Sequence, residues 1–217
     1  MSAPRQNERD RMVKVQLEGR GIRSPKVLEA FRRVPRHEFV SSELQGRAYE
    51  DGPLPIGSGQ TISQPYMVAL MTEAAEVEPG NKVLEVGTGC GYQTAILAEL
   101  RAEVFTVERV PKLAAAARER LRRLGWGKIR FRVGDGTLGW PEEAPFEAIL
   151  VAAGAPRIPR PLTGQLAPAG RLVIPLEEGW SQTLYLVRRT ADGLRRERQT
   201  LCTFVPLIGE FGWPDDR

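Results

Sequence analysis

Hydrophobic and polar positions follow two different periods along the chain. Before about residue 40, apolar residues recur at helical spacing over residues 11–19 and 24–34. After residue 81, short apolar runs alternate with helical segments, and residues 146–152 are almost entirely apolar, as in a central strand of a parallel sheet. Strands are expected at 82–86, 103–107, 129–133, 146–152, 171–174, 183–188 and 194–204, and helices at 65–76, 92–100, 111–124 and 160–166.

This order predicts an α/β fold: a doubly wound, mostly parallel sheet with an N-terminal helical segment and a C-terminal β-hairpin around Ala191, Asp192 and Gly193. The length of 217 residues suits one domain over 1–217, with a helical and substrate-loop region at 1–80 and a cofactor-binding sheet at 81–217. Residues 51–64 mix glycine, proline and hydroxyl side chains and are predicted to form a loop. Such a loop in a compact domain usually carries function.

Composition narrows the class of protein. The sequence is 41% hydrophobic and 27% charged, which is typical of a globular chain. No apolar run approaches the roughly 20 residues of a bilayer span, and the polar N-terminus does not resemble a secretory signal, so we expect a cytoplasmic protein. Cys90 and Cys202 lack the spacing of a zinc site, and His37 is the single histidine, expected at the surface beside a helix. We therefore expect no metal, and the net charge of +4 indicates a solvated surface of mixed sign.

The strongest chemical signal is a glycine-rich turn between a strand and a helix, from Val83 to Tyr92. Ligands of open α/β sheets bind beyond the carboxyl ends of the strands. The glycines have the spacing GxGxG rather than GxGxxG, which suits a nucleoside without a pyrophosphate.

Two acidic residues follow the next strands. Glu108 ends the second strand, where a carboxylate can accept both ribose hydroxyls, although an exposed surface glutamate is the alternative. Asp135 lies between Gly134 and Gly136 and can face an adenine amino group, although a plain Asp-Gly turn is the alternative.

Together these motifs resemble the Rossmann-like methyltransferases that use S-adenosylmethionine. A second set of motifs is similar to the protein-L-isoaspartate(D-aspartate) O-methyltransferase family, and the resemblance covers about residues 12–210. It rests on the runs LPIGSGQTISQPYM at 54–67, EVGTGCGY at 85–92, AILVAAGAP at 148–156 and FVPL at 204–207.

The resemblance implies an enzyme that transfers a methyl group from S-adenosyl-L-methionine to the α-carboxylate of L-isoaspartyl and D-aspartyl residues in damaged proteins, leaving S-adenosyl-L-homocysteine. It implies a catalytic Ser63, and Glu85 stands where many relatives have aspartate. Substrate contacts are expected at Thr61, Ile62, Ser63, Val205, Pro206 and Leu207, and cofactor contacts at Glu85, Gly87, Thr88, Gly89, Gly91, Glu108, Asp135 and Gly136.

This reaction suits a chain with one histidine. A carboxylate is already ionised at neutral pH, so no general base is needed, and alignment of the reacting atoms becomes the main requirement. Ser63 can hold the carboxylate in line, or it can cap the helix that begins near Pro65. We expect Ser63 to position the carboxylate rather than to activate it.

Other classes fit the sequence less well. A base-nitrogen methyltransferase usually carries an Asn/Asp-Pro-Pro-aromatic turn after the fourth strand, where this chain has Val151-Ala152-Ala153-Gly154. Carbon-5 enzymes need a cysteine that typically follows proline, whereas Cys90 follows glycine and Cys202 follows leucine. A nicotinamide dehydrogenase lacks its GxGxxG motif here, and an inactive module would show a broken glycine loop. The expected partners are age-damaged proteins and peptides, with no nucleic acid, no membrane and a monomeric state.

Overall fold

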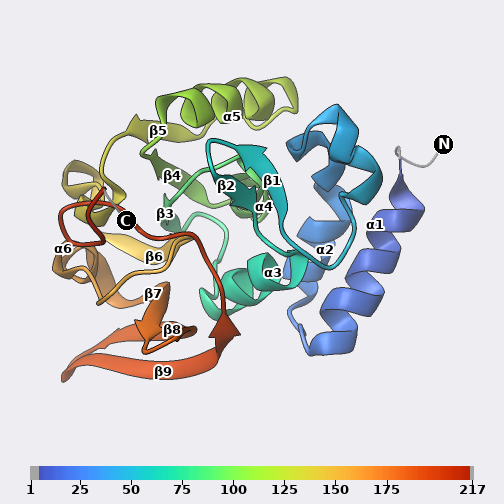
Figure 1. Cartoon of the computed structure of the whole chain (residues 1–217). Coiled ribbons are helices and arrows are strands. Elements are labelled where there is room, and N and C mark those ends of the chain that lie inside the picture. Colours follow the sequence, from blue (N-terminus) through green and yellow to red (C-terminus); the bar gives the residue numbers. More distant parts are fainter. Residues whose placement is uncertain (1–4, 216–217) are drawn as a thin grey trace.

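The computed structural model describes residues 5–215, and within them the fold is built on one seven-stranded sheet (Figure 1). The strand order is β5-β4-β3-β6-β7-β8-β9; β5, β4, β3, β6 and β7 are parallel neighbours, and β8 and β9 add an antiparallel hairpin. The predicted fold class is confirmed. The strands are β3 Lys82–Val86, β4 Glu103–Glu108, β5 Arg130–Val133, β6 Phe146–Val151, β7 Leu166–Glu178, β8 Ser181–Thr190 and β9 Gly193–Cys202.

The helices begin close to the predicted positions. Proline stands at the first turn of α2, α3, α5 and α6, where its missing N–H costs no hydrogen bond. The first helix changes its winding along its length. α1 continues into a wider π-helical turn and then into a tighter 3₁₀ turn. The helices are α1 Gln6–Met12, α2 Pro25–Arg33, α3 Pro65–Ala74, α4 Tyr92–Glu99, α5 Pro111–Arg123 and α6 Arg160–Gly164; η1 Val13–Leu17 and η2 Glu18–Arg20 follow α1, and η3 Arg36–Phe39, η4 Ser42–Arg47, η5 Gly136–Leu138 and η6 Pro141–Glu143 are 3₁₀ turns.

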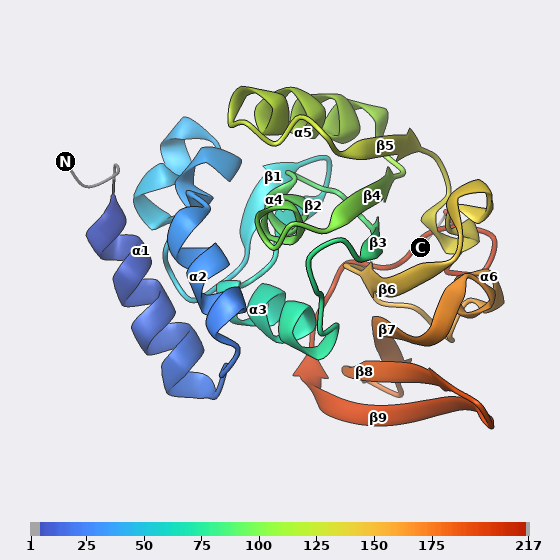
Figure 2. The same cartoon turned by 180° about the vertical axis from the view of Figure 1, so that it is seen from behind.

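Side chains of each strand alternate between two hydrophobic layers. In β6, Ala148 and Leu150 pack with the N-terminal helices, whereas Ile149 and Val151 pack on the opposite face with residues such as Leu162 of α6. Figures 1 and 2 place α1, α2 and α3 on one side of the sheet and α6 on the other. Both faces of the central strands are therefore buried, which explains their nearly continuous apolar sequence.

The predicted loop at residues 51–64 contains a small antiparallel hairpin. Strands β1 Leu54–Gly57 and β2 Gln60–Ile62 pair with each other, and Leu54 lies opposite Ile62. Gly57, Ser58 and Gly59 all have positive φ, and two of the three are glycines, which adopt this conformation without a steric penalty. The loop prediction was wrong here because such short strands carry no periodic signal of their own.

Two further expectations need correction. Strand β7 is much longer than the predicted 171–174, since its second half extends past β6 to pair with β8. His37 is buried rather than at the surface, with 7% of its area exposed and its Nδ1 2.7 Å from the Tyr49 hydroxyl oxygen. Burial lowers the pKa of His37, and its role is that of a packed side chain in η3.

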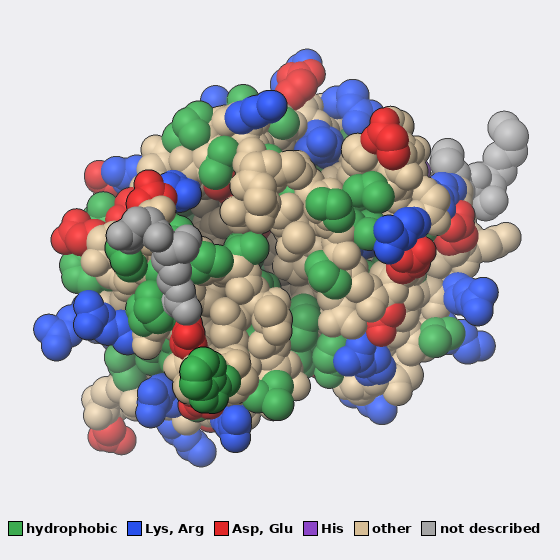
Figure 3. All heavy atoms as spheres, in the orientation of Figure 1, with side chains coloured by type: hydrophobic (Ala, Val, Ile, Leu, Met, Phe, Trp, Pro, Cys, Tyr) green, Lys and Arg blue, Asp and Glu red, His purple; other side chains and the backbone are tan. Residues whose placement is uncertain are grey.

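The surface carries both signs of charge. Figure 3 shows lysine, arginine and acidic side chains scattered over the drawn face rather than gathered by sign. Between residues 5 and 215, no helix has the length and hydrophobicity needed to cross a membrane.

Candidate active site

A cavity of about 330 Å³, named the principal cavity below, lies at the carboxyl ends of β3, β4 and β6. The chain reverses its direction of strand addition between β3 and β6, so this is the point where ligands of open α/β sheets bind. The hairpin β1–β2 and a C-terminal segment close the cavity from the other side, so both predicted regions of the chain contribute. Its lining comes from residues 59–63, Val68, 86–90, Tyr92, Gln93, 107–110, Gly136, Ala152, Ala153, 205–208 and Asp215.

Glycine is required at two positions around this cavity for different reasons. Gly136 lines it, and a Cβ on Gly136 would lie 2.4 Å from Cγ1 of Val86. Gly91 lies outside the lining, has φ of +90°, and a Cβ there would lie 2.9 Å from Cδ1 of Leu121 in α5. Gly91 therefore lets α5 pack against the turn, whereas Gly87 and Gly89 face the cavity with Thr88 between them.

Glu108 lies at the end of β4 with 7% of its area exposed, and it lines the cavity. Its Oε2 accepts a hydrogen bond from the Gly89 N–H at 2.8 Å, and its Oε1 accepts one from the Val110 N–H at 2.8 Å. A carboxylate offers about four acceptor positions, so each oxygen retains capacity for a ligand hydroxyl. The alternative of an exposed surface glutamate does not hold.

Glu85 lies behind the glycine turn and not in the cavity lining. It is fully buried, and its Oε2 accepts hydrogen bonds from the hydroxyls of Thr94 at 2.6 Å and Thr106 at 2.8 Å. Thr106 in turn contacts the hydroxyl of Thr88 at 2.6 Å, which connects Glu85 to the cavity wall. Burial raises the pKa of Glu85 to about 8, so the group is protonated at neutral pH.

Asp135 also lies outside the lining. Its Oδ1 accepts hydrogen bonds from the backbone and hydroxyl of Thr137, and its Oδ2 accepts one from the Glu210 N–H at 2.8 Å. Asp135 thus caps η5, which carries Gly136, and ties the C-terminal segment to this turn.

Ser63 follows β2 and lines the cavity together with Thr61 and Ile62. The N-cap position of α3 is occupied by Gln64, so helix capping does not account for Ser63. The Ser63 carbonyl accepts a hydrogen bond from Nη2 of Arg36 at 2.8 Å. The hairpin packs on the glycine turn, since a Cβ on Gly89 would lie 3.3 Å from Ile56.

Val205, Pro206 and Leu207 form the opposite wall. The Gly154 N–H donates to the Val205 carbonyl at 2.8 Å, and the Leu207 N–H donates to the Gly154 carbonyl at 2.8 Å. Gln182 holds the preceding residue through two hydrogen bonds to the backbone of Phe204, of 2.7 and 3.1 Å. The predicted substrate residues at 61–63 and 205–207 are therefore brought together around one cavity.

A second cavity of about 510 Å³ adjoins the first. Both are lined by Thr61, Ser63, Ala152 and Val205, so they meet at the candidate serine. The second cavity is also lined by Arg20, Pro53, Gln64, Tyr66, Met67, Trp180, Ser181, Phe204 and residues 200–203, with no acidic side chain among the lining residues.

Several residues with a role in this site were not identified from the sequence. Arg36 binds the carbonyl of Ser63, and Arg120 of α5 donates from Nη1 to the Cys90 carbonyl of the glycine turn at 2.9 Å. Arg109 and Asp215 form an ion pair of 2.7 Å at the cavity wall. No motif marks these residues, because an isolated arginine in a sequence is indistinguishable from a solvated one. Across residues 5–215, no group of three or more His, Cys, Asp or Glu side chains is arranged to hold a metal ion.

Known proteins are similar to this chain in sequence. The family model for Protein-L-isoaspartate(D-aspartate) O-methyltransferase (PCMT) matches residues 7–212. The protein-L-isoaspartate O-methyltransferase of Trichlorobacter lovleyi is 57% identical over 206 residues, which cover 94% of this chain and 95% of that protein. The protein of the same name from Pelotomaculum thermopropionicum is 52% identical over 98% of this chain and 93% of its own length.

Solved structures of two proteins have a similar fold. A protein-L-isoaspartate O-methyltransferase structure has a TM-score of 0.86 at 29% identity, covering 94% of this chain and 67% of that one. A Plasmodium falciparum structure assigned to the same activity, in complex with S-adenosyl-L-homocysteine, has a TM-score of 0.81 at 28% identity and covers 92% and 98%. The chain therefore belongs to the protein-L-isoaspartate(D-aspartate) O-methyltransferase family.

Proposed function

We propose that this chain transfers a methyl group from S-adenosyl-L-methionine to the α-carboxylate of L-isoaspartyl residues, and of D-aspartyl residues, in damaged proteins. The observation that carries the proposal is the meeting of two elements at one cavity: a glycine turn with a buried Glu108, and a hairpin that ends at Ser63. The family gives the activity, and this geometry supplies a place for each reactant.

The cofactor side of the cavity comprises residues 86–90, 107–110 and Gly136. Glu108 keeps free acceptor capacity toward the cavity, which suits two ribose hydroxyls. Gly136 leaves the wall flat beside Val86, which suits an adenine ring. When bound, the cofactor supplies an electrophilic methyl group on a sulfonium.

Three predicted cofactor residues lie outside the cavity lining and hold residues that belong to it. Glu85 is linked to Thr88 by hydrogen bonds through Thr106, and Gly91 leaves room for α5 to pack against the glycine turn. Asp135 caps the turn that carries Gly136. In the proposal they shape the cofactor side without contacting the cofactor.

The substrate side comprises residues 59–63 of the hairpin and residues 205–208. The attacking carboxylate is ionised at neutral pH, so the site has to hold one of its oxygens in line with the methyl carbon. Ser63 lines both cavities, and in the proposal its hydroxyl or N–H binds that carboxylate. The resulting ester collapses to a succinimide without the enzyme, and hydrolysis of the succinimide returns part of the residue to aspartate.

The polypeptide on one side of the isoaspartyl residue is assigned to the second cavity. Thr61, Ser63 and Val205 lie on both cavities, so a chain leaving the reactive carboxylate enters the second without a break. Trp180 offers a fully exposed ring there, and Tyr66 offers a ring over which Arg20 lies at 3.7 Å. Damaged proteins and peptides are the proposed partners of a cytoplasmic, monomeric enzyme.

The test uses purified protein, tritiated S-adenosylmethionine and three peptides that differ at one residue: L-isoaspartate, D-aspartate or L-aspartate. Base-labile label is expected on the L-isoaspartyl peptide, less on the D-aspartyl peptide and none on the L-aspartyl peptide. Binding of S-adenosylhomocysteine is measured by calorimetry in parallel. Cofactor binding without label on any peptide would reject the proposed substrate, and RNA would be the next substrate to test.

A further inference from the structure

Arg36 is a charged side chain with no exposed surface beside the segment that carries Ser63. Its Nε donates to the Ala48 carbonyl at 2.8 Å, and its Nη2 donates to the Ser63 carbonyl at 2.8 Å. The guanidinium carbon lies 4.8 Å from the centre of the Tyr92 ring, and Tyr92 lines the principal cavity. The planar guanidinium of Arg36, called the fork below, thus contacts three separate segments: Ser63 just after β2, Ala48 just after η4, and Tyr92 of the cavity wall.

The charge of Arg36 is not neutralised by the surrounding fold. Among residues 5–215 its electrostatic partners are Tyr92, Cys90 and Tyr49 rather than a carboxylate, and its Nη1 has no hydrogen-bond partner there. Burial lowers the pKa of Arg36, but a guanidinium stays protonated in proteins. A buried charge without a counter-charge is costly, and a hydrocarbon side chain would fill the same space with less penalty. Stability of the fold therefore does not explain why a cation occupies this position.

We propose that Arg36 is a positioning residue for the methyl transfer, an inference that rests on the proposed function. The two hydrogen bonds of Arg36 fix the carbonyl of Ser63, a residue of the cavity lining, and so restrict where its hydroxyl and N–H can lie. The fixed positive charge attracts the substrate carboxylate toward Ser63. Arg36 touches neither reactant and acts through Ser63 and through its electric field.

The charge of Arg36 and its hydrogen bonds to the backbone should affect different kinetic constants. In the reaction, a carboxylate oxygen forms a bond to the methyl carbon, and the electron pair of the sulfur–carbon bond passes to sulfur. The carboxylate becomes a neutral ester, so the attraction to Arg36 is strongest before the reaction and declines as the transition state forms. Loss of the charge should therefore raise KM for the peptide, and loss of the fork should lower kcat.

Two substitutions test this separation. Arg36→Met removes both the charge and the fork, and we expect kcat/KM for the isoaspartyl peptide to fall about 100-fold, since small misplacements at a site of alignment have effects of that order. Arg36→Lys keeps the charge but cannot hold both carbonyls in one plane. We expect kcat to fall about tenfold in this variant while KM stays within about threefold of the wild type.

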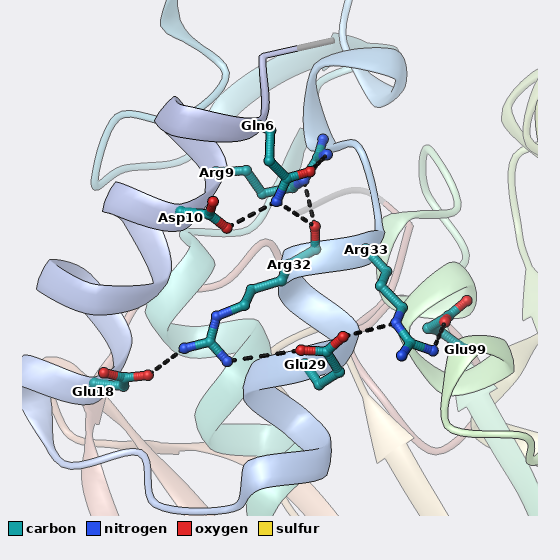
Figure 4. A network of polar contacts seen from close by, with 8 residues as sticks. All are labelled: Gln6, Arg9, Asp10, Glu18, Glu29, Arg32, Arg33 and Glu99. Atoms are coloured by element: carbon teal, nitrogen blue, oxygen red, sulfur yellow. Dashed lines mark hydrogen bonds and ion pairs between the residues drawn. The ribbon is translucent and has the colours of Figure 1, made fainter. Parts of the chain in front are cut away.

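Arg9 provides a matched control in the same chain. It is also buried, with 2% of its area exposed, and its Nε donates to the Arg32 carbonyl at 2.6 Å between α1 and α2 (Figure 4). Neither arginine lines the principal cavity, but Arg36 donates to Ser63, which does, whereas the partners of Arg9 are Gln6, Arg32 and Tyr49, which do not. Arg9→Met should therefore change Tm by about as much as Arg36→Met does, in the same direction, but leave kcat and KM per folded molecule unchanged.

The measurements are peptide kinetics at saturating S-adenosylmethionine, calorimetric Kd for S-adenosylhomocysteine, and Tm for every variant. The inference is supported if the Kd of Arg36→Met stays within about threefold of the wild type while its kcat/KM falls far below that of Arg9→Met. It is overturned if cofactor affinity falls in parallel with activity, or if both methionine variants are equally active. Should Arg36→Met not fold, the kcat and KM of Arg36→Lys decide. An inactive wild type would instead reject the proposed function.

Discussion

The cofactor side and the substrate side of the principal cavity are built by different kinds of contact. On the cofactor side, neighbouring parallel strands hold the glycine turn, as in the bonds from Gly87 N–H to Val107 and from Gly89 N–H to Glu108. On the substrate side, backbone bonds of Gly154 hold residues 205–207, and the flanking irregular segments depend on single side chains from elsewhere, Arg36 on Ser63 and Gln182 on Phe204. The first arrangement is part of the sheet, whereas the second depends on individual long-range partners. Substitutions on the two sides should therefore affect different steps.

The largest effect is expected on the cofactor side. Glu108→Ala removes the proposed acceptor of the ribose hydroxyls and leaves the Gly89 and Val110 N–H groups without their acceptor. Hydrogen bonds to charged groups are worth about 1.5–3 kcal/mol, so Kd for S-adenosylhomocysteine should rise about 100-fold by calorimetry.

Glu103→Ala is the control for Glu108→Ala, because Glu103 is an exposed glutamate at the other end of the same strand. It should leave Kd unchanged. A Glu108→Ala protein with near-normal Kd but a raised peptide KM would reverse the assignment of the two sides.

A pH-dependent effect is expected within the sheet behind the cofactor side. Burial raises the pKa of Glu85 from 4.5 to about 8, so the folded chain keeps a proton that the unfolded chain releases. Stability from this group is therefore lost as pH rises from about 4.5 to about 8, at up to about 1.4 kcal/mol per pH unit. Between pH 6 and pH 9 the wild type should lose about 3 kcal/mol more than Glu85→Gln, measured by urea unfolding.

Glu85→Gln should also leave Kd for S-adenosylhomocysteine within about threefold, because Glu85 lies behind the lining. Equal pH dependence in the two proteins would show that Glu85 is ionised in the folded state. A large rise in Kd would place Glu85 in direct contact with the cofactor.

The same contrast determines how much the sequence could predict. The strand, glycine turn and helix around Gly87 are contiguous, and their apolar period and glycine spacing are local signals. Glu108 could be placed because parallel strands end at the same edge of the sheet. Asp135 could not, because the same Asp-Gly turn serves a ligand or its own backbone, and the structure shows it bound to Thr137 and Glu210.

The substrate side carried weaker signals. Ser63 was assigned by resemblance alone, and the hairpin around it was predicted as a loop, since strands of three and four residues have no measurable period. Arginine is usually exposed, so nothing in the sequence marks Arg36 as buried. Its burial follows from the positions of Ala48, Ser63 and Tyr92, which only the folded chain defines.

A smaller, purely kinetic effect is expected at Ser63. Ser63→Ala removes one donor to the carboxylate but keeps the backbone N–H, so kcat for the isoaspartyl peptide should fall about tenfold with Kd for S-adenosylhomocysteine unchanged. Ser42→Ala, on η4 and outside the lining of both cavities, is the control. A parallel loss of cofactor affinity would show that Ser63 belongs to the cofactor side.

The smallest effect is expected at the outer end of the second cavity. Trp180 lies in the turn between β7 and β8 with its ring fully exposed, and an exposed aromatic ring beside a cavity can stack against a passing peptide. Trp180→Ala should raise KM about threefold for an isoaspartyl peptide with several flanking residues and leave KM for a minimal isoaspartyl peptide unchanged. Leu194→Ala, an exposed apolar residue at the far end of β9, controls for surface hydrophobicity. If Trp180→Ala changes neither KM, the flanking chain does not contact this turn, and the groups around Tyr66 and Arg20 become the next place to look for it.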